Sequence, residues 1–151
     1  MRNEKLSFKR RNLPQLLLQA REAVLARFRP LLNEAGFTEQ QWRIVRALVE
    51  HGPLEPRQIV PLCGISSPSL TGILSRMEET GLVKRERIAE DQRRLLVTAT
   101  PKSRMMASKI APKVEEAYEQ LESEVDATLL DHLYESLTEL IEKIESEVED
   151  A

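Results

Sequence analysis

The sequence contains few of the residues on which disulfide, metal and catalytic sites depend. Its 151 residues include one cysteine, Cys63, and two histidines, which excludes an intrachain disulfide framework and leaves no metal-ligand spacing. No apolar run approaches membrane length, and no apolar signal-peptide segment follows the charged N-terminus. Nucleophile–base pairs and phosphate-binding glycine loops are also absent from the sequence. We therefore expect a cytoplasmic protein that is not an enzyme and has no cofactor, metal or membrane partner.

What the chain does contain is enough apolar sequence for one folded domain. Hydrophobic residues make up 41% of the composition, which at this length can bury a proper core. There are no internal repeats and no Gly/Ser linker. We predict a single domain over residues 1–151.

Charge is divided unequally along the chain, although the whole carries a formal net charge of only −3. Residues 115–151 hold 14 acidic side chains against one basic side chain, Lys143, whereas residues 1–114 have a net charge of +10. A basic part can bind phosphates while an acidic helical part points away from them. Residues 1–12 form a basic arm, either a solvated terminus or a supplementary contact with DNA or a partner subunit.

A helix with two different faces is predicted to begin at Ser67, with Ser67 as its cap and Pro68 at the first helical position. Gly81 is expected to end it as a left-handed residue. One face is apolar at helical spacing and is formed by Leu70, Ile73, Leu74 and Met77. The opposite face is small or polar and is formed by Ser69, Thr71, Gly72, Ser75 and Arg76.

A basic hairpin follows this helix, with strands predicted over 82–87 and 94–98 and a tip over 88–93. Asp91 is expected to fix the tip by pairing with one arginine, which leaves a second arginine free to reach DNA. The two arginines are Arg93 and Arg94. A slim polar helix and a basic hairpin suit the major groove and the backbone or minor groove of DNA, respectively. A solvated charged turn is the alternative for the hairpin.

These segments carry the resemblance to a known family. The matching residues are Leu70-Thr71-x-x-Leu74-x-x-Met77-Glu78-x-x-Gly81-Leu82-Val83, then Asp91-x-Arg93-Arg94 and the strand that leads to Thr100. This order of recognition helix, wing and capped helix resembles the MarR family of winged-helix transcription factors. Residues 19–23, 28–30 and 38–46 are similar to the homoprotocatechuate-degradation operon regulators within it. The resemblance implies DNA contacts from Ser66, Ser67, Ser69, Thr71, Gly72, Ser75, Arg76, Arg93 and Arg94.

The outer helices carry more apolar surface than a lone winged helix can cover. The first is predicted from Leu13 to about Leu32 with a bend at Pro30, and a long helix is capped by Thr100 and followed by a last helix over 126–148. Pairing with a second copy would cover their stripes, and in the family these helices form the dimer. We therefore expect a mainly α fold with a small β wing. Residues 38–100 would form the DNA-binding lobe, and residues 13–34 and 101–148 would supply the dimerisation helices.

Two short helices are predicted between these parts. Thr38 and Gln41 form a capping box for the first, which ends at Gly52. The second begins at Glu55–Pro56, with Pro61 inside it. Their inward residues are predicted to be Trp42, Ile44, Val45, Leu48 and Val49 in the first and Ile59, Val60 and Leu62 in the second. Cys63 is expected to be a small buried hydrophobe rather than an oxidant sensor.

A ligand site is suggested by Arg21, a cation beside the apolar stripe of the first helix. It is either a snorkelling arginine or one in an ion pair across the dimer, or it is a receptor for the carboxylate of a small organic acid. Trp42, the only tryptophan, is either core or a platform for the ligand. The resemblance implies a phenolic acid bound between the dimerisation helices and the DNA-binding lobe. We expect the contacts to come from Arg21, Phe28, Trp42 and Arg46.

The sequence thus favours a homodimeric, sequence-specific DNA-binding regulator that acts as a repressor on a near-palindromic operator. If the resemblance is a guide, a small aromatic acid releases it, and its target genes serve aromatic-acid catabolism. A dimeric helical interaction module without DNA binding would explain the apolar stripes but not the basic hairpin. A regulator that senses another signal, such as an oxidant, is the remaining alternative.

Overall fold

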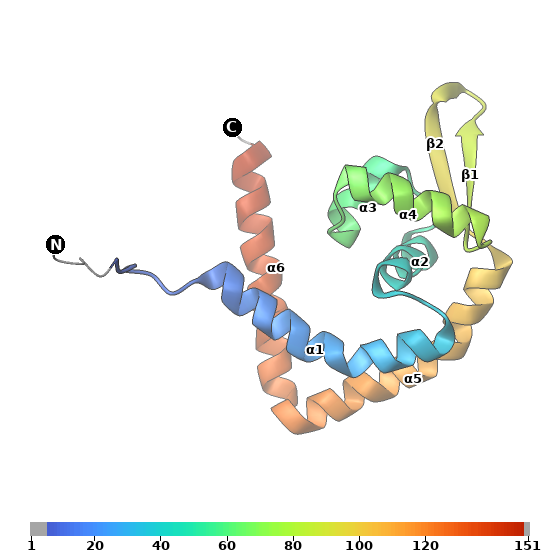
Figure 1. Ribbon diagram of the computed structural model, residues 1–151. Helices are drawn as coiled ribbons and strands as arrows, with labels where there is room; N and C mark the ends of the chain where they lie inside the picture. The colour runs from blue at the N-terminus through green and yellow to red at the C-terminus, as the bar shows by residue number, and fades with distance from the viewer. Residues whose placement is uncertain (1–5, 150–151) are drawn as a thin grey trace. The chain divides into compact units, whose positions relative to one another are not determined.

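The computed structural model describes residues 6–149 as six helices and one two-stranded antiparallel sheet (Figure 1). In chain order the elements are α1 (Leu13–Ala35), α2 (Glu39–His51), α3 (Pro56–Cys63), α4 (Ser67–Glu79), β1 (Val83–Ile88), β2 (Asp91–Ala99), α5 (Pro101–Val125) and α6 (Ala127–Glu149). The mainly α fold with a small β wing is confirmed. The chain divides into two compact units, and the boundary lies between Ala107 and Ser108, within α5. Arg2 and Lys5 of the basic arm lie outside the described residues.

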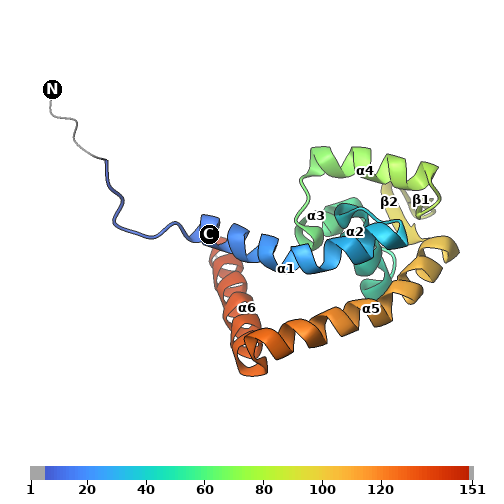
Figure 2. The same cartoon turned by 60° about the horizontal axis from the view of Figure 1, so that its bottom comes forward.

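The core of the first unit lies between three helices and the hairpin: α2 and α3 pack on each other and on β2, and α4 packs on α3 and β1. Figure 2 shows α4 on the outside of this unit, beside α3 and the β1–β2 hairpin. Deeply buried side chains of this core include Ile44, Leu48, Ile59, Leu70, Leu74, Met77 and Val97. Burial of each contributes about 1.5–3 kcal/mol, so this packing fixes α4 with its apolar face inward. The predicted apolar face of α4 is confirmed.

Local capping signals fix where α2 and α5 begin. Thr38 and Gln41 form the expected capping box of α2, with bonds of 3.1 Å and 3.0 Å. Thr100 accepts the Ser103 amide at 3.2 Å in front of α5. Helix α1 begins at Leu13 as predicted and ends at Ala35, about three residues beyond the predicted end near Leu32. Pro30 lies inside the helix.

The cap and the first helical residue of α4 each lie one position earlier than predicted. Its cap is Ser66, whose hydroxyl accepts the Ser69 amide at 3.4 Å, and Ser67 is the first helical residue. Two consecutive serines offer the same capping chemistry, so composition alone did not separate them. The end is confirmed: Gly81 has φ of 77° and lies just beyond the cap, and Leu82 donates to the carbonyl of Met77 at 2.8 Å.

The hairpin is tighter than predicted, because its strands extend closer to the turn. Ile88 is paired with Asp91 in the ladder, so only Ala89 and Glu90 form the turn. The expected six-residue tip over 88–93 is therefore wrong, and Arg93 lies within β2. A register irregularity between Arg87 and Ile88 allows this short closure.

Two residues predicted to point inward are instead exposed. Val49 of α2 is 44% exposed and Leu62 of α3 is 51% exposed. Each lies about 100° around its helix from a buried neighbour, Leu48 or Cys63, and so falls at the edge of a narrow buried arc. The other predicted inward residues of these helices are buried or half-buried.

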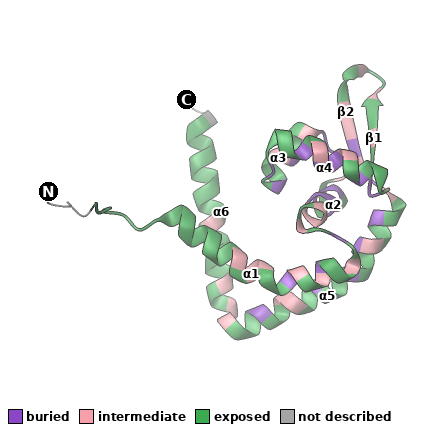
Figure 3. Ribbon diagram, viewed as in Figure 1, coloured by how far each residue is buried: buried purple, intermediate pink, exposed green. Residues whose placement is uncertain are grey.

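The second unit comprises residues 108–149 of α5 and α6. Helix α5 continues through Pro112, and Asp126 with φ of 83° separates it from α6. Figure 3 shows that α6 is exposed over most of its length, as is the first half of α1 in the other unit. The exposed large apolar residues of α6 are Leu129, Leu133, Tyr134, Leu140, Ile141, Ile144 and Val148. Among residues 6–149, no helix is long and apolar enough to cross a membrane.

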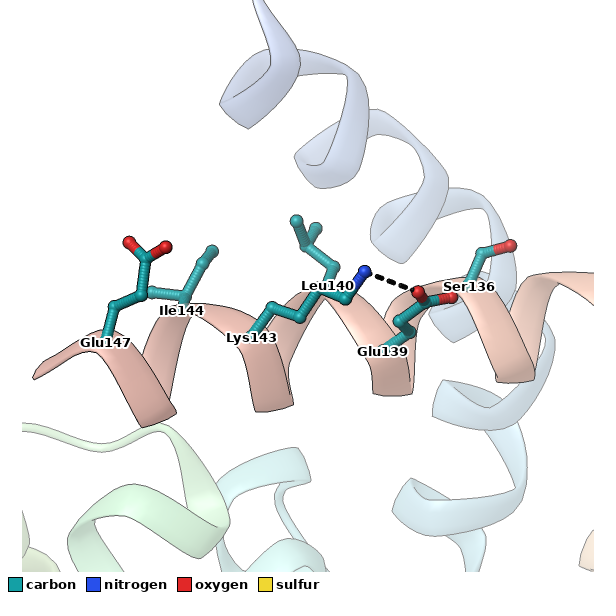
Figure 4. A pocket seen from close by; sticks show the side chains of 6 residues that line it. All are labelled: Ser136, Glu139, Leu140, Lys143, Ile144 and Glu147. Atoms are coloured by element: carbon teal, nitrogen blue, oxygen red, sulfur yellow. Dashed lines mark ion pairs between the residues drawn. The ribbon is translucent and has the colours of Figure 1, made fainter. Parts of the chain in front are cut away.

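One stretch of α6 shows the mixed character of this surface. Leu140 and Ile144 lie along the helix beside Glu139, Lys143 and Glu147 (Figure 4). Lys143 pairs with Glu139 one turn earlier at 2.8 Å. An apolar stripe flanked by charged side chains is typical of a helix that packs against another helix.

Candidate nucleic-acid interface

The exposed face of α4 presents short polar side chains and one long cation. Ser66, Ser67, Ser69, Thr71 and Arg76 are exposed, while Gly72 and Ser75 are half-buried. These are the seven residues predicted at the start and on the polar face of this helix, and none of them belongs to its buried face of Leu70, Ile73, Leu74 and Met77. A helix with so slim a face can enter the major groove, which is about 12 Å wide.

Hydroxyl groups at the start of α4 are held in place by one another and by the backbone. Ser66 donates to the Ser69 hydroxyl at 3.0 Å, and Thr71 donates to the carbonyl of Ser67 at 3.2 Å. A hydroxyl oxygen can accept further bonds while it donates one. These residues can therefore contact base edges or phosphates without leaving their positions.

The wing carries an almost fully exposed arginine. The side chain of Arg93 is 93% exposed, and the carboxylate of Asp91 accepts from its backbone amide at 3.1 Å and from its Nε at 3.3 Å. The arginine that pairs with Asp91 is thus Arg93. This contact orders the backbone next to the turn and leaves most of the guanidinium in solvent.

The second wing arginine, Arg94, is not free, contrary to the sequence prediction. Its Nε and Nη2 donate to the two carboxylate oxygens of Glu55 at 2.9 Å and 3.1 Å. Glu55 lies just before α3, and its side chain is only 8% exposed. Hydrogen bonds from Arg94, together with Arg57, lower the pKa of the Glu55 carboxyl from 4.5 to about 2. Sequence reasoning missed this partner because 39 residues separate the pair.

Other cations near α4 are also paired. Arg85 of β1 donates to both oxygens of Glu78 at 3.3 Å and 3.1 Å, and this lowers the pKa of the Glu78 carboxyl. Lys84 pairs with Glu86 at 2.6 Å. The exposed arginines Arg57 and Arg87 were not among the predicted contacts, because nothing in their local sequence distinguishes them from solvated charge.

Arg21 lies in a cluster of five charged residues, which we call the Glu39 cluster: Arg21, Glu22, Arg29, Glu39 and Arg43. The guanidinium of Arg21 contacts the carboxylate of Glu39 directly and that of Glu22 at 3.4 Å. Arg29 lies 2.8 Å from Glu22 and 3.8 Å from Glu39, and Arg43 lies 3.7 Å from Glu39. Arg21 is therefore in ion pairs, but they form within one chain rather than across a dimer as predicted.

Arg43 connects this cluster to α3. Its Nη1 donates to the carbonyl of Cys63, while its Nε is buried and has no hydrogen-bond partner among the described residues. The Cys63 thiol is buried and donates to the Arg43 carbonyl at 3.5 Å. Burial raises the pKa of this thiol, which disfavours the reactive thiolate.

The remaining predicted ligand residues are dispersed over α1 and α2. Phe28 is buried, and Trp42 is half-buried with its ring 5.6 Å from that of Phe37. Arg46 is exposed, and its Nε pairs with Glu50 at 2.7 Å. Trp42 and Arg46 lie one turn apart on α2, after Glu39. Within 6–149, no group of three or more His, Cys, Asp or Glu residues could hold a metal ion.

Comparison with known proteins gives the family. Residues 35–94 match the model of the MarR family. The chain is 41% identical over 134 residues to the homoprotocatechuate degradative operon repressor of Escherichia coli, which covers 89% of this chain and 90% of that protein. It is 40% identical over 135 residues to the HTH-type transcriptional regulator FarR of Neisseria gonorrhoeae, which covers 89% of each. The crystal structure of NadR in complex with 4-hydroxyphenylacetate has 38% identity and a TM-score of 0.78, over 90% of this chain and 96% of that one.

These relatives are transcriptional regulators rather than enzymes, in agreement with the expectation from the sequence, and they favour a regulator over a mere interaction module. The similarity extends beyond α4 and the wing to nearly the whole chain. The protein belongs to the MarR family of winged-helix transcriptional regulators.

Proposed function

We propose that the protein is a homodimeric repressor that binds a near-palindromic operator. The observation that carries this proposal is the slim polar face of α4 beside an exposed wing arginine, within one compact unit. Each copy would place α4 in a major groove and Arg93 beside the adjacent minor groove or backbone. The proposed contacts are Ser66, Ser67, Ser69, Thr71, Gly72, Ser75, Arg76 and Arg93. Arg94 is left out of this set, because its guanidinium is bound to Glu55.

Dimerisation is proposed through residues 13–34 and 101–148, with 38–100 as the DNA-binding lobe. The exposed leucines and isoleucines of α1 and α6 support this assignment, since such stripes are covered in stable proteins. Two-fold symmetry would set the half-site centres about 10 base pairs apart. Light scattering is expected to give twice the mass of one 17.3 kDa chain. A stable folded monomer at micromolar concentration would contradict the proposal.

The effector is proposed to be a small aromatic acid. Relatives about 40% identical include a repressor named for homoprotocatechuate degradation, and NadR binds 4-hydroxyphenylacetate. The Glu39 cluster also supports a carboxylate ligand, because its three arginines exceed its two glutamates by one charge. Arg21 would hold the carboxylate, and Phe28, Trp42 and Arg46 would complete the site. We place the protein in the cytoplasm, with genes of aromatic-acid catabolism as its targets.

The effector would release DNA only if it binds the two states of the protein unequally. It must bind a spacing of the lobes that does not fit the operator more tightly than the spacing that does. Oxidant sensing is the less favoured signal, because Cys63 is buried beside Arg43 with its thiol pKa raised.

Binding to duplexes selected from a random pool by the wild-type protein tests the first part of the proposal. We expect affinity to fall steeply with salt, since phosphate contacts release counterions. Thermal shift against a panel of aromatic acids tests the second part, because a ligand that binds the folded state raises the unfolding temperature. Absence of any duplex selection would refute the DNA-binding part, and absence of any stabilising acid would refute the effector part alone.

A further inference from the structure

The wing is attached to the segment before α3 at two points. The backbones of Leu54 and Val97 exchange two hydrogen bonds of 3.0 Å and 2.8 Å, which adds a one-residue bridge to β2. Three residues further toward the tip, Arg94 grips the carboxylate of Glu55 with two nitrogens. At about 3.3 Å per residue, these attachments lie roughly 10 Å apart along β2. Two separated attachments fix the direction of the wing, whereas a single attachment would allow the wing to pivot.

The outer attachment, between Arg94 and Glu55, allows only one geometry. Its two hydrogen bonds define both the distance and the plane of the guanidinium. A lysine would pair through a single nitrogen and would not fix the plane. Glu55 is also fixed from its own side, since its backbone amide donates to the side chain of Gln58 at 2.8 Å. The low pKa of the carboxyl keeps it charged, and a buried charge holds firmly to its partner.

Beyond Arg94, the contacts that the structure describes for the wing lie within the wing itself: Asp91 accepts from Arg93, and Ile88 pairs with Asp91. Arg93 is the next residue outward, and its side chain is almost fully exposed. We infer that Glu55 is a positioning residue, which holds the wing through Arg94 so that Arg93 can meet DNA, and that Arg94 itself is not a DNA contact. This inference rests on the proposed DNA-binding function.

Electrostatics alone and a positioning role predict opposite changes in DNA affinity when the Glu55 charge is removed, so the direction of the change distinguishes them. Loss of the Glu55 charge beside a DNA-binding surface removes repulsion from phosphates and should tighten binding. It would also free Arg94 to contact a phosphate, which should steepen the dependence of affinity on salt by roughly one unit. A positioning role predicts weaker binding and no steepening, because a displaced wing would carry Arg93 away from the DNA.

The experiment measures the affinity and salt dependence of Glu55→Gln, Arg93→Ala, the double variant and Arg94→Lys on the duplex selected by wild type. Arg94→Lys keeps the positive charge but loses the two-pronged grip. We expect each single variant to bind at least about tenfold more weakly, the factor for one charge-assisted hydrogen bond. The double variant should lose little beyond Arg93→Ala, since Glu55 acts through Arg93. Glu78→Gln is the matched control, because it removes one charge from a similar two-bond pair with Arg85 and should bind at least as tightly as wild type.

Wild-type or tighter binding by Glu55→Gln or Arg94→Lys would overturn the inference, and so would additive losses in the double variant. Hydrogen exchange of the free protein separates this failure from failure of the proposed function. In Glu55→Gln, backbone amides of the outer wing (88–93) should exchange faster while those of α4 keep wild-type rates. An unchanged wing would refute the positioning role even where DNA binding stands. If Glu55→Gln does not fold, Arg94→Lys carries the same comparison.

Discussion

Two glutamates of this protein each gather arginines, yet their surroundings differ. Glu55 is 8% exposed at its side chain and is gripped by Arg94 through two bonds near 3 Å. Glu39 is 22% exposed and is shared by Arg21, Arg29 and Arg43, the last two at 3.8 Å and 3.7 Å. The buried Glu55 carboxylate, bound by two hydrogen bonds from one arginine, holds the wing to the segment before α3. The less buried Glu39 carboxylate lies among more cations than it can neutralise, so its arginines can exchange partners, which suits ligand binding.

The largest expected effect is on the response to an effector. In Arg21→Gln, the concentration of 4-hydroxyphenylacetate, or of the best acid from the panel, needed for half-release of the operator should rise at least tenfold. Glutamine removes the cationic, two-pronged guanidinium that grips a carboxylate, and a hydrogen bond between charged groups contributes about 1.5–3 kcal/mol. Operator binding without effector should remain close to wild type. Titration of operator release in both proteins measures the change.

Arg29→Gln is the matched control for this titration, because Arg29 belongs to the same cluster but lies farther from Glu39. Equal midpoints for wild type and Arg21→Gln would mean that Arg21 is not the anchor. If Arg21→Gln instead loses stability and DNA affinity together, its pairing with Glu39 is structural and the two glutamates have the same role.

The second prediction concerns tolerance to lysine. Arg21→Lys should retain most of the effector response, because an open cluster needs a cation without fixed geometry. Arg94→Lys should lower the unfolding temperature, because lysine cannot make both bonds to Glu55. Thermal unfolding of the two variants, side by side with effector titration of Arg21→Lys, makes the comparison. Equal tolerance at both positions would remove the distinction drawn between the clusters.

The third prediction is a pH dependence of the Glu55 pair. The folded-state pKa of Glu55 is about 2, below its ordinary value of 4.5, so the unfolded chain takes up a proton first as pH falls. The pair's contribution to stability should be complete above about pH 4.5 and lost as pH falls toward 2. The difference in unfolding free energy between wild type and Glu55→Gln, measured by denaturant titration from pH 7 downward, should shrink over that interval. If wild type and Glu55→Gln already had equal unfolding free energies at pH 4.5, the folded-state pKa of Glu55 could not lie as low as about 2.

The smallest expected effect is that of Arg29→Gln on stability. Arg29 is 42% exposed, and ion pairs of that kind contribute about 0–1 kcal/mol. Denaturant unfolding should therefore differ from wild type by less than about 1 kcal/mol. A larger loss would show that the Glu39 cluster is as structural as the Glu55 pair.

Local signals in the sequence were sufficient for the helices, and long-range pairing was not visible in it. The box of Thr38 and Gln41 and the left-handed Gly81 act within a few residues, so their outcome could be predicted. Both arginine partnerships join distant segments, 39 residues apart for Arg94 and 18 for Arg21. Nothing in the sequence near Glu55 marks it as buried. Sequence reasoning thus identified the arginines, but it could not find the glutamates that decide how each arginine can act.

The single tryptophan gives this protein an optical reporter of its own. Trp42 lies one turn after Glu39 on α2, half-buried beside Phe37, and the emission of an indole depends on the polarity around it. All tryptophan fluorescence of the chain therefore originates beside the proposed effector site, and an acid that enters there can be titrated without a label. The wing has no tryptophan or tyrosine, so variants of Glu55 or Arg94 should leave this emission unchanged. Trp42 emission can thus report ligand entry independently of any change in the wing.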